Sequence, residues 1–140
     1  MKNNYVDKIY ELAVSAFNND EIPVGAIVVK DGKIIAEGVN DREKKHNVVG
    51  HAEINAITKA CEVLGDWRLD ECEMYVTLFP CMMCAGAILE SRIKKIYYLC
   101  NRTNVCYEIK DYINCEKINN VDVEKKCLDL LRLFFENKRN

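Results

Sequence analysis

The sequence lacks the long apolar runs of a membrane protein and the charge excess of a uniformly basic one. No run of about 18 apolar residues occurs in the 140-residue chain, so we expect no membrane span. Residues 1–17 carry charges among their apolar positions and do not predict a signal peptide. Lys and Arg number 20 against 22 Asp and Glu, a net charge of −2, so any phosphate-binding surface must be a local patch.

Histidine is also scarce, whereas cysteine is plentiful. The two histidines, His46 and His51, are the only candidates for a site that needs imidazole, and His46 lies in a charged segment where we expect it to be exposed. Eight cysteines could indicate a secreted disulfide framework. Without a secretory signal, a reduced cytoplasmic protein is the better interpretation, and clustered cysteines there usually bind metal or take part in catalysis.

Hydrophobic patterning predicts one α/β domain over residues 1–140. Helical spacing of apolar residues covers 4–18, 51–64, 81–92 and 124–140. Strand patterns lie on either side of Asp31-Gly32 within residues 23–40, at 74–79 and at 93–100, with a short further strand near 112–115. This alternation predicts a three-layer α/β/α sandwich with a central mixed sheet of about five strands flanked by helices.

The candidate metal-ligating and catalytic side chains lie in two short segments, His51-Ala52-Glu53 and Pro80-Cys81-Met82-Met83-Cys84. Zinc prefers nitrogen and thiolate ligands, and a catalytic zinc site keeps its fourth position for water. Cys81 and Cys84 are three residues apart at a predicted helix start, so both can face one ion, and the helix dipole there favours thiolates. His51 would be the third ligand.

Glu53 suits the role of a general acid/base that reaches the water without binding the metal. Taken alone, each segment has a simpler interpretation. A lone CxxC can be a redox pair or two buried thiols. A lone histidine is usually a polar side chain that is hydrogen-bonded within the fold. The two halves together, each at a predicted strand-to-helix junction, favour a hydrolytic zinc site.

Zinc deaminases that act on cytosine or adenine have this HxE and PCxxC order. The segments EIPVGAIVV, EGVN, HAEINAI, LGDWRLDECEMYVTLFPCMMCAGAILESRI and CLDLLRLFFENKRN resemble the bacterial tRNA-specific adenosine deaminases of the cytidine deaminase superfamily, which make inosine at the anticodon wobble position. The resemblance implies one Zn²⁺ per subunit, a tRNA anticodon stem-loop as substrate and a cytoplasmic homodimer. It also implies substrate contacts by Val24, Asn40, Ala52, Phe79 and Pro80.

Two departures from this family keep other functions open. Phe79 stands where the family usually has Glu; it is similar to deoxycytidylate deaminases at this position, or is simply a buried aromatic at a strand end. Residues 99–105 lack the family's Asp and its Lys/Gly-containing RNA-contacting loop. A deaminase of a free base or nucleotide, of the guanine or deoxycytidylate type, is therefore an alternative. A non-catalytic partner subunit is another, although the intact His51, Glu53, Cys81 and Cys84 argue against it.

Basic residues near two predicted element ends could contact RNA or simply be solvated. These are Arg92, Lys94, Lys95, Lys138 and Arg139. The remaining cysteines lack paired metal spacing, so we expect structural or incidental roles for them. They are Cys61, Cys72, Cys100, Cys106, Cys115 and Cys127.

Overall fold

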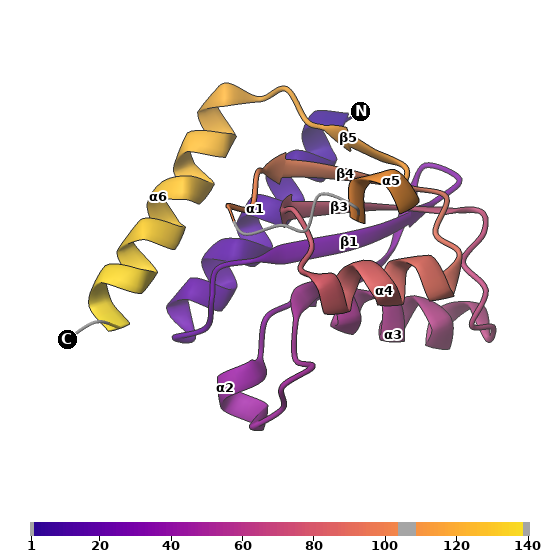
Figure 1. Cartoon of the computed structure of the whole chain (residues 1–140), viewed down its shortest axis with the longest axis horizontal. Helices are drawn as coiled ribbons and strands as arrows, with labels where there is room; N and C mark the ends of the chain where they lie inside the picture. The colour runs from indigo at the N-terminus through magenta and orange to yellow at the C-terminus, as the bar shows by residue number, and fades with distance from the viewer. Residues whose placement is uncertain (1, 104–108, 139–140) are drawn as a thin grey trace.

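The computed structural model describes residues 2–103 and 109–138, which form a sheet with helices packed on its faces (Figure 1). In this part of the chain, no helix has both the length and the apolar character needed to cross a bilayer. The elements are α1 (Lys2–Asn18), β1 (Gly25–Lys30), β2 (Lys33–Val39), α2 (Arg42–Lys45), α3 (Ala52–Leu64), β3 (Cys72–Leu78), α4 (Met82–Ser91), β4 (Lys95–Cys100), α5 (Ile109–Tyr112), β5 (Cys115–Lys117) and α6 (Val121–Lys138).

The sheet has five strands in the order β2-β1-β3-β4-β5. β1 pairs antiparallel with β2 and with β3, whereas β3–β4 and β4–β5 are parallel pairs. The hairpin between β1 and β2 turns at Asp31 and Gly32, which have φ angles of 51° and 76°. Two positive φ values in a two-residue loop are what an Asp-Gly hairpin turn requires, so the predicted hairpin and the predicted mixed sheet are confirmed.

Side chains of alternating strand residues fill two layers of core. Ile27 of β1 and Tyr75 of β3 pack with Ile9 of α1 on one face of the sheet. Their neighbours along the strands, such as Val28 and Met74, belong to the cluster that includes the alanines of α3 and Ile88 of α4. Figure 1 shows α1 on one side of the sheet, α3 and α4 on the other, and α6 alongside α1. The predicted three-layer α/β/α arrangement is confirmed.

The structure corrects the prediction for the segment before the last helix. Tyr112, the first residue of the strand predicted near 112–115, instead ends the short helix α5 and is exposed. The last strand begins at Cys115, which pairs with Ile96 of β4. A β-branched and aromatic composition in so short a segment does not distinguish a single turn of helix from an edge strand. Residues 104–108, which include Cys106 and the end of the 99–105 segment, lie outside the described residues.

Candidate metal centre and substrate cavity

His51 stands immediately before α3 with an extended backbone. Its carbonyl accepts a 3.0 Å hydrogen bond from the N–H of Asn55, which begins the helix. The side-chain amide of Asn55 in turn donates to the Val39 carbonyl at 2.8 Å and to Asp41 Oδ1 at 3.0 Å. These bonds tie the end of β2 to the first turn of α3 and fix the backbone from which the imidazole projects.

β2 and α3 approach each other most closely at Gly38. A Cβ at this position would lie 2.1 Å from the carbonyl oxygen of Ala52 and 2.6 Å from the backbone nitrogen of Ala56, so only glycine fits. Two residues later, the buried Asn40 accepts a 2.9 Å hydrogen bond at Oδ1 from the N–H of Ala52. That N–H belongs to the first turn of a helix, where donors lack intrahelical partners.

The two cysteines of the PCxxC segment occupy the start of α4. Cys81 is the residue that caps the helix, and its carbonyl accepts a 2.8 Å hydrogen bond from the N–H of Ala85. Cys84 lies in the first turn and is fully buried. β3 brings this turn into place, because it ends at Leu78 and the next residue still bonds to the Cys100 carbonyl of β4.

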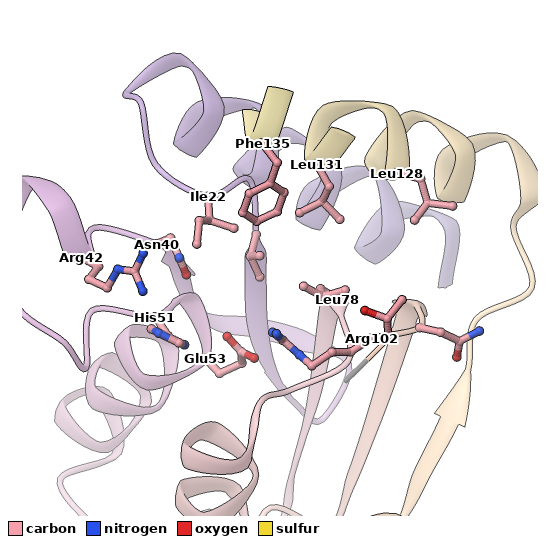
Figure 2. Close-up of a pocket in the computed structure, with 13 residues that line it drawn as sticks. Ile22, Asn40, Arg42, His51, Glu53, Leu78, Arg102, Leu128, Leu131 and Phe135 are labelled. Atoms are coloured by element: carbon pink, nitrogen blue, oxygen red, sulfur yellow. The ribbon is translucent and has the colours of Figure 1, made fainter. Parts of the chain in front are cut away.

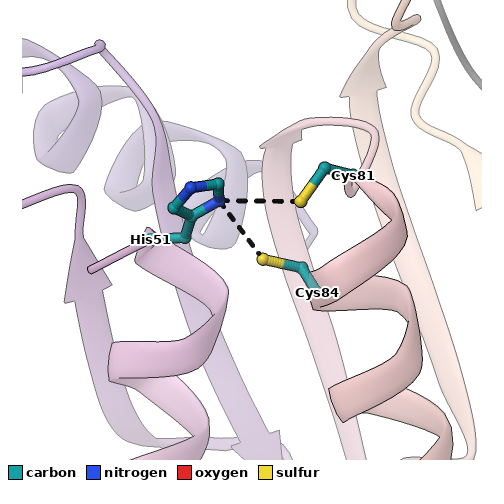
Figure 3. A group of neighbouring side chains, drawn as sticks. All are labelled: His51, Cys81 and Cys84. Carbon is teal, nitrogen blue, oxygen red and sulfur yellow. Dashed lines mark hydrogen bonds between the residues drawn. The ribbon is translucent and has the colours of Figure 1, made fainter. Parts of the chain in front are cut away.

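The sulfurs of both cysteines face the same nitrogen of His51 (Figure 3). His51 Nδ1 lies 3.7 Å from Cys81 Sγ and 3.5 Å from Cys84 Sγ, and the three ligand atoms are all within 4.8 Å of one another. Tetrahedral zinc with ordinary Zn–N and Zn–S bonds separates its ligand atoms by about 3.5–3.8 Å. The spacing and the donor set of one imidazole and two sulfurs therefore fit a metal ion of this kind.

The thiols of the pair interact directly. Both are free, and the hydrogen bond between them lowers the pKa of Cys81 to about 4 and raises the pKa of Cys84, because the Cys84 thiol donates to a Cys81 thiolate. The site thus already favours one thiolate, the form that binds metals.

Glu53 lies in the first turn of α3, two residues after His51, and is 2 % exposed. Its carboxylate is not a member of the three-residue ligand group found in the described part of the chain. Burial raises the pKa of Glu53 to about 7, with a further increase from the nearby Cys81 and an opposing effect of the Arg102 guanidinium. A carboxyl group with these properties can both accept and donate a proton near neutral pH.

A cavity of about 430 Å³ opens over His51 and Glu53, within the size range of small-molecule sites. Figure 2 shows these two residues at one side of the cavity and side chains of α6 at the opposite side. Its lining is Ile22, Val24, Asn40, Arg42, His51, Glu53, Leu78, Asn101, Arg102, Thr103, Leu128, Leu131 and Phe135.

Several residues that line the cavity were not predicted from the sequence to belong to the site. The last helix has the single apolar side that its sequence predicts, but part of that side lines the cavity: Cys127 and Phe134 are buried, while Leu128 and Phe135 are 44 % and 48 % exposed and line the cavity with Leu131. Arg42 and Arg102 were not predicted, because nothing in their spacing relates them to the HxE and PCxxC segments.

Of the five predicted substrate contacts, the structure places two at the cavity. Val24 and Asn40 line it. Ala52, Phe79 and Pro80 are buried and are not among the lining residues. Phe79, 1 % exposed, packs edge-on against Tyr98 with ring centroids 4.9 Å apart, as a buried strand-end aromatic would. Substrate contact by these three residues remains a prediction that the cavity does not support.

The basic residues suggested as RNA contacts lie elsewhere. Arg92, at the end of α4, packs over the Trp67 ring at 5.1 Å, Lys94 is exposed, and Lys95 pairs with Glu116 at 2.9 Å. Lys138 ends α6, and Arg139 lies outside the described residues. Of the described side chains among these, those of Arg92, Lys94 and Lys95, none lines the cavity. His46 is exposed as expected.

Comparisons with known proteins agree with this geometry. The tRNA-specific adenosine deaminase of Bacillus subtilis is 36 % identical over 96 % of this chain and 89 % of its own length. A solved structure described as a tRNA:A34 deaminase of A-to-I editing at the wobble position of transfer RNA superposes with a TM-score of 0.82 at 31 % identity, covering 92 % of this chain and 99 % of the other.

A relative with a different substrate is also similar. The guanine deaminase of Bacillus subtilis is 48 % identical over 59 % of this chain and 53 % of its own length. The family model for MafB19-like deaminases matches residues 1–139. The chain therefore belongs to the MafB19-like deaminase family.

Proposed function

We propose that this protein is a zinc-dependent hydrolase that converts adenosine to inosine at the wobble position of a tRNA anticodon. The observation that carries the proposal is the His51–Cys81–Cys84 group beside the buried Glu53 at the base of the cavity. The relatives that match nearly the whole chain and carry the names of tRNA adenosine deaminases support the choice of substrate.

His51, Cys81 and Cys84 would hold one zinc ion per subunit, because their three ligand atoms leave a fourth tetrahedral position for water. Zinc in such a site is a Lewis acid that lowers the pKa of water to about 7. Glu53 would move the protons: its carboxylate takes one from the attacking water and delivers it to a ring nitrogen of the base, and then takes the second from the hydroxyl on the reacting carbon and delivers it to the amino group that leaves as ammonia.

Asn40 orients the base in this proposal. Its Oδ1 is already held by the N–H of Ala52, so its amide N–H groups are the part that remains for a substrate acceptor. The apolar wall of Val24, Leu78 and Phe135 offers contact surface to the face or edge of a purine. The base must leave its stack to enter, as in other deaminases that act on nucleic acids.

A guanine deaminase is the second candidate, and the 48 % identity to such an enzyme over 59 % of this chain favours it. One experiment distinguishes the two functions. The purified protein is incubated with an anticodon stem-loop carrying adenosine at the wobble position, and in parallel with guanine, deoxycytidylate and adenosine. Inosine in the RNA supports the first proposal, and ammonia released only from a small molecule refutes it.

We further propose that residues 1–140 form one domain that works as a homodimer in the cytoplasm. The exposed apolar side chains of Val48 and Met82 lie within three residues of metal ligands and offer a surface for a second copy. The seven described cysteines are all free, which fits a reducing compartment. Light scattering after size exclusion tests the dimer: a monomer at micromolar concentration would refute it.

A further inference from the structure

A buried carboxylate outside the candidate metal centre takes no part in the proposed reaction. Glu21 is 2 % exposed and lies between α1 and β1, one residue before Ile22 of the cavity wall. In the part of the chain that the structure describes, its carboxylate makes two hydrogen bonds and no ion pair. Burying a charged group is costly unless it is paired or hydrogen-bonded, so these two bonds must compensate for the burial of Glu21.

Both hydrogen bonds go to the backbone of α2. Glu21 Oε1 accepts from the N–H of Glu43 at 3.0 Å, and Oε2 accepts from the N–H of Lys44 at 2.8 Å. N–H groups in the first turn of a helix lack intrahelical acceptors, and the residue before the helix usually caps them. Here that residue, Asp41, makes no such bond, and its Oδ1 accepts instead from the side-chain amide of Asn55. Glu21 therefore caps α2 from outside the helix.

α2 has little besides this cap to hold it in place. It is a single turn of four residues, none of them buried, and so short a helix is unstable on its own. Figure 1 shows α2 at the edge of the molecule, away from the sheet. The position of α2 therefore depends strongly on the carboxylate of Glu21.

The loop that contains α2 has a second attachment, at its base next to His51. The N–H of Asp41 donates to the Gly50 carbonyl at 2.9 Å. A Cβ at Gly50 would lie 2.6 Å from Asp41 Oδ1 and 2.9 Å from the backbone nitrogen of Arg42, so the two ends of the loop are in contact there. The backbone at His51 is thus fixed without Glu21, whereas α2, whose first residue Arg42 lines the cavity, is not.

We propose that Glu21 is a positioning residue for substrate binding: its carboxylate caps α2 and thereby keeps the cavity rim at Arg42 in the conformation that receives the substrate. Glu21 does not line the cavity, so it acts through α2 and not by contact with the reacting base. A rim that has to become ordered during binding costs affinity. The inference rests on the proposed function and adds to it a residue outside the metal centre.

The test compares the metal-loaded full-length protein with Glu21→Gln and Glu21→Ala. Glutamine is nearly isosteric and keeps one acceptor oxygen, whereas alanine keeps none. Asp66→Asn is the matched control, because Asp66 also accepts a hydrogen bond from a backbone N–H, that of Arg68 at 3.0 Å, and does not line the cavity. kcat and KM are measured with the anticodon stem-loop, and zinc content by mass spectrometry. Amide hydrogen exchange is followed in peptides covering residues 41–50 and 52–64.

KM for the stem-loop should rise about tenfold or more in Glu21→Ala, since hydrogen bonds to charged groups contribute that much, and by a smaller factor in Glu21→Gln. kcat should stay within about twofold of the wild type, and zinc content should not change. Exchange should become faster at 41–50 and keep its wild-type rate at 52–64, because the opening is local. Asp66→Asn should match the wild type in KM and in exchange at 41–50.

An unchanged KM in both Glu21 variants, with the wild type active on the stem-loop, would overturn this inference alone. A fall in kcat or in zinc content as large as the rise in KM would also overturn it, because Glu21 would then act on the metal centre. If Glu21→Ala does not fold, Glu21→Gln decides by the same measurements. If the wild type acts only on a free base, the proposed function fails, and KM for that base together with exchange at 41–50 still decides whether Glu21 positions the rim.

Discussion

The Oδ1 atom of Asn40 accepts a 2.9 Å hydrogen bond from the backbone N–H of Ala52, and this contact joins a cavity-lining side chain to the helix start that carries His51 and Glu53. The same residue thus supports the backbone that carries the candidate metal ligand His51 and lines the cavity. Without its oxygen, the N–H of Ala52 would be buried and unpaired.

We therefore expect Asn40→Ala to lower both stability and activity. Leaving a buried donor unpaired should reduce the free energy of unfolding by about 1–3 kcal/mol, measured by urea denaturation. Asn114→Ala is the control: the amide of Asn114 bonds to the Lys94 carbonyl at an exposed position, and its loss should change stability by less than about 0.5 kcal/mol. Equal stabilities for the two variants would contradict the structural role of Asn40.

Gly38→Ala tests the close approach of β2 to α3. The added methyl group meets the Ala52 carbonyl at 2.1 Å, so the first turn of α3 must shift, at a cost of about 1–3 kcal/mol. Because that turn follows His51, metal content should fall together with the melting temperature. Lys33→Ala, at the exposed start of the same strand, should change neither. A Gly38→Ala protein with wild-type stability and metal content would refute this account of the strand–helix contact.

The two adjacent phenylalanines of α6 should behave differently. Phe134 is 8 % exposed and Phe135 is 48 % exposed and lines the cavity. Phe134→Ala should lower the free energy of unfolding by about 3–5 kcal/mol, as other buried aromatic truncations do. Phe135→Ala should leave stability nearly unchanged and raise KM for the RNA substrate, because it removes stacking surface. Thermal denaturation and steady-state kinetics separate the two effects, and the reverse pattern would contradict the described orientation of α6.

Much of this architecture was accessible from the sequence because its signals are local. Asp31-Gly32 demands a hairpin turn, and the spacing of Cys81 and Cys84 at a helix start puts both sulfurs on one side. The contributions of Arg42, Arg102 and the cavity-lining residues of α6 depend on which distant segments fold against the cavity. The last strand was predicted about three residues too early, near 112–115 instead of at Cys115–Lys117, because so short a segment carries no clear period.

Glu53→Gln should separate proton transfer from metal binding. The carboxylate is not one of the three grouped ligands, so the variant should keep the wild-type metal content. Glutamine is nearly isosteric but cannot accept or deliver the protons, so kcat should fall about 10²- to 10⁴-fold. Inosine formation in the stem-loop RNA and metal analysis of the same sample give both values. Loss of metal together with activity would make Glu53 a ligand and contradict the assigned role.

The most direct measurement is the zinc content, by mass spectrometry, of protein purified without chelators, for the wild type and for Cys84→Ser and Cys72→Ser. Cys84 belongs to the ligand group, whereas Cys72 is equally buried but outside it. The account predicts about one zinc per chain in the wild type and in Cys72→Ser, and little in Cys84→Ser. A wild type without bound metal, or with its Cys81 and Cys84 sulfurs joined in a disulfide, would contradict it.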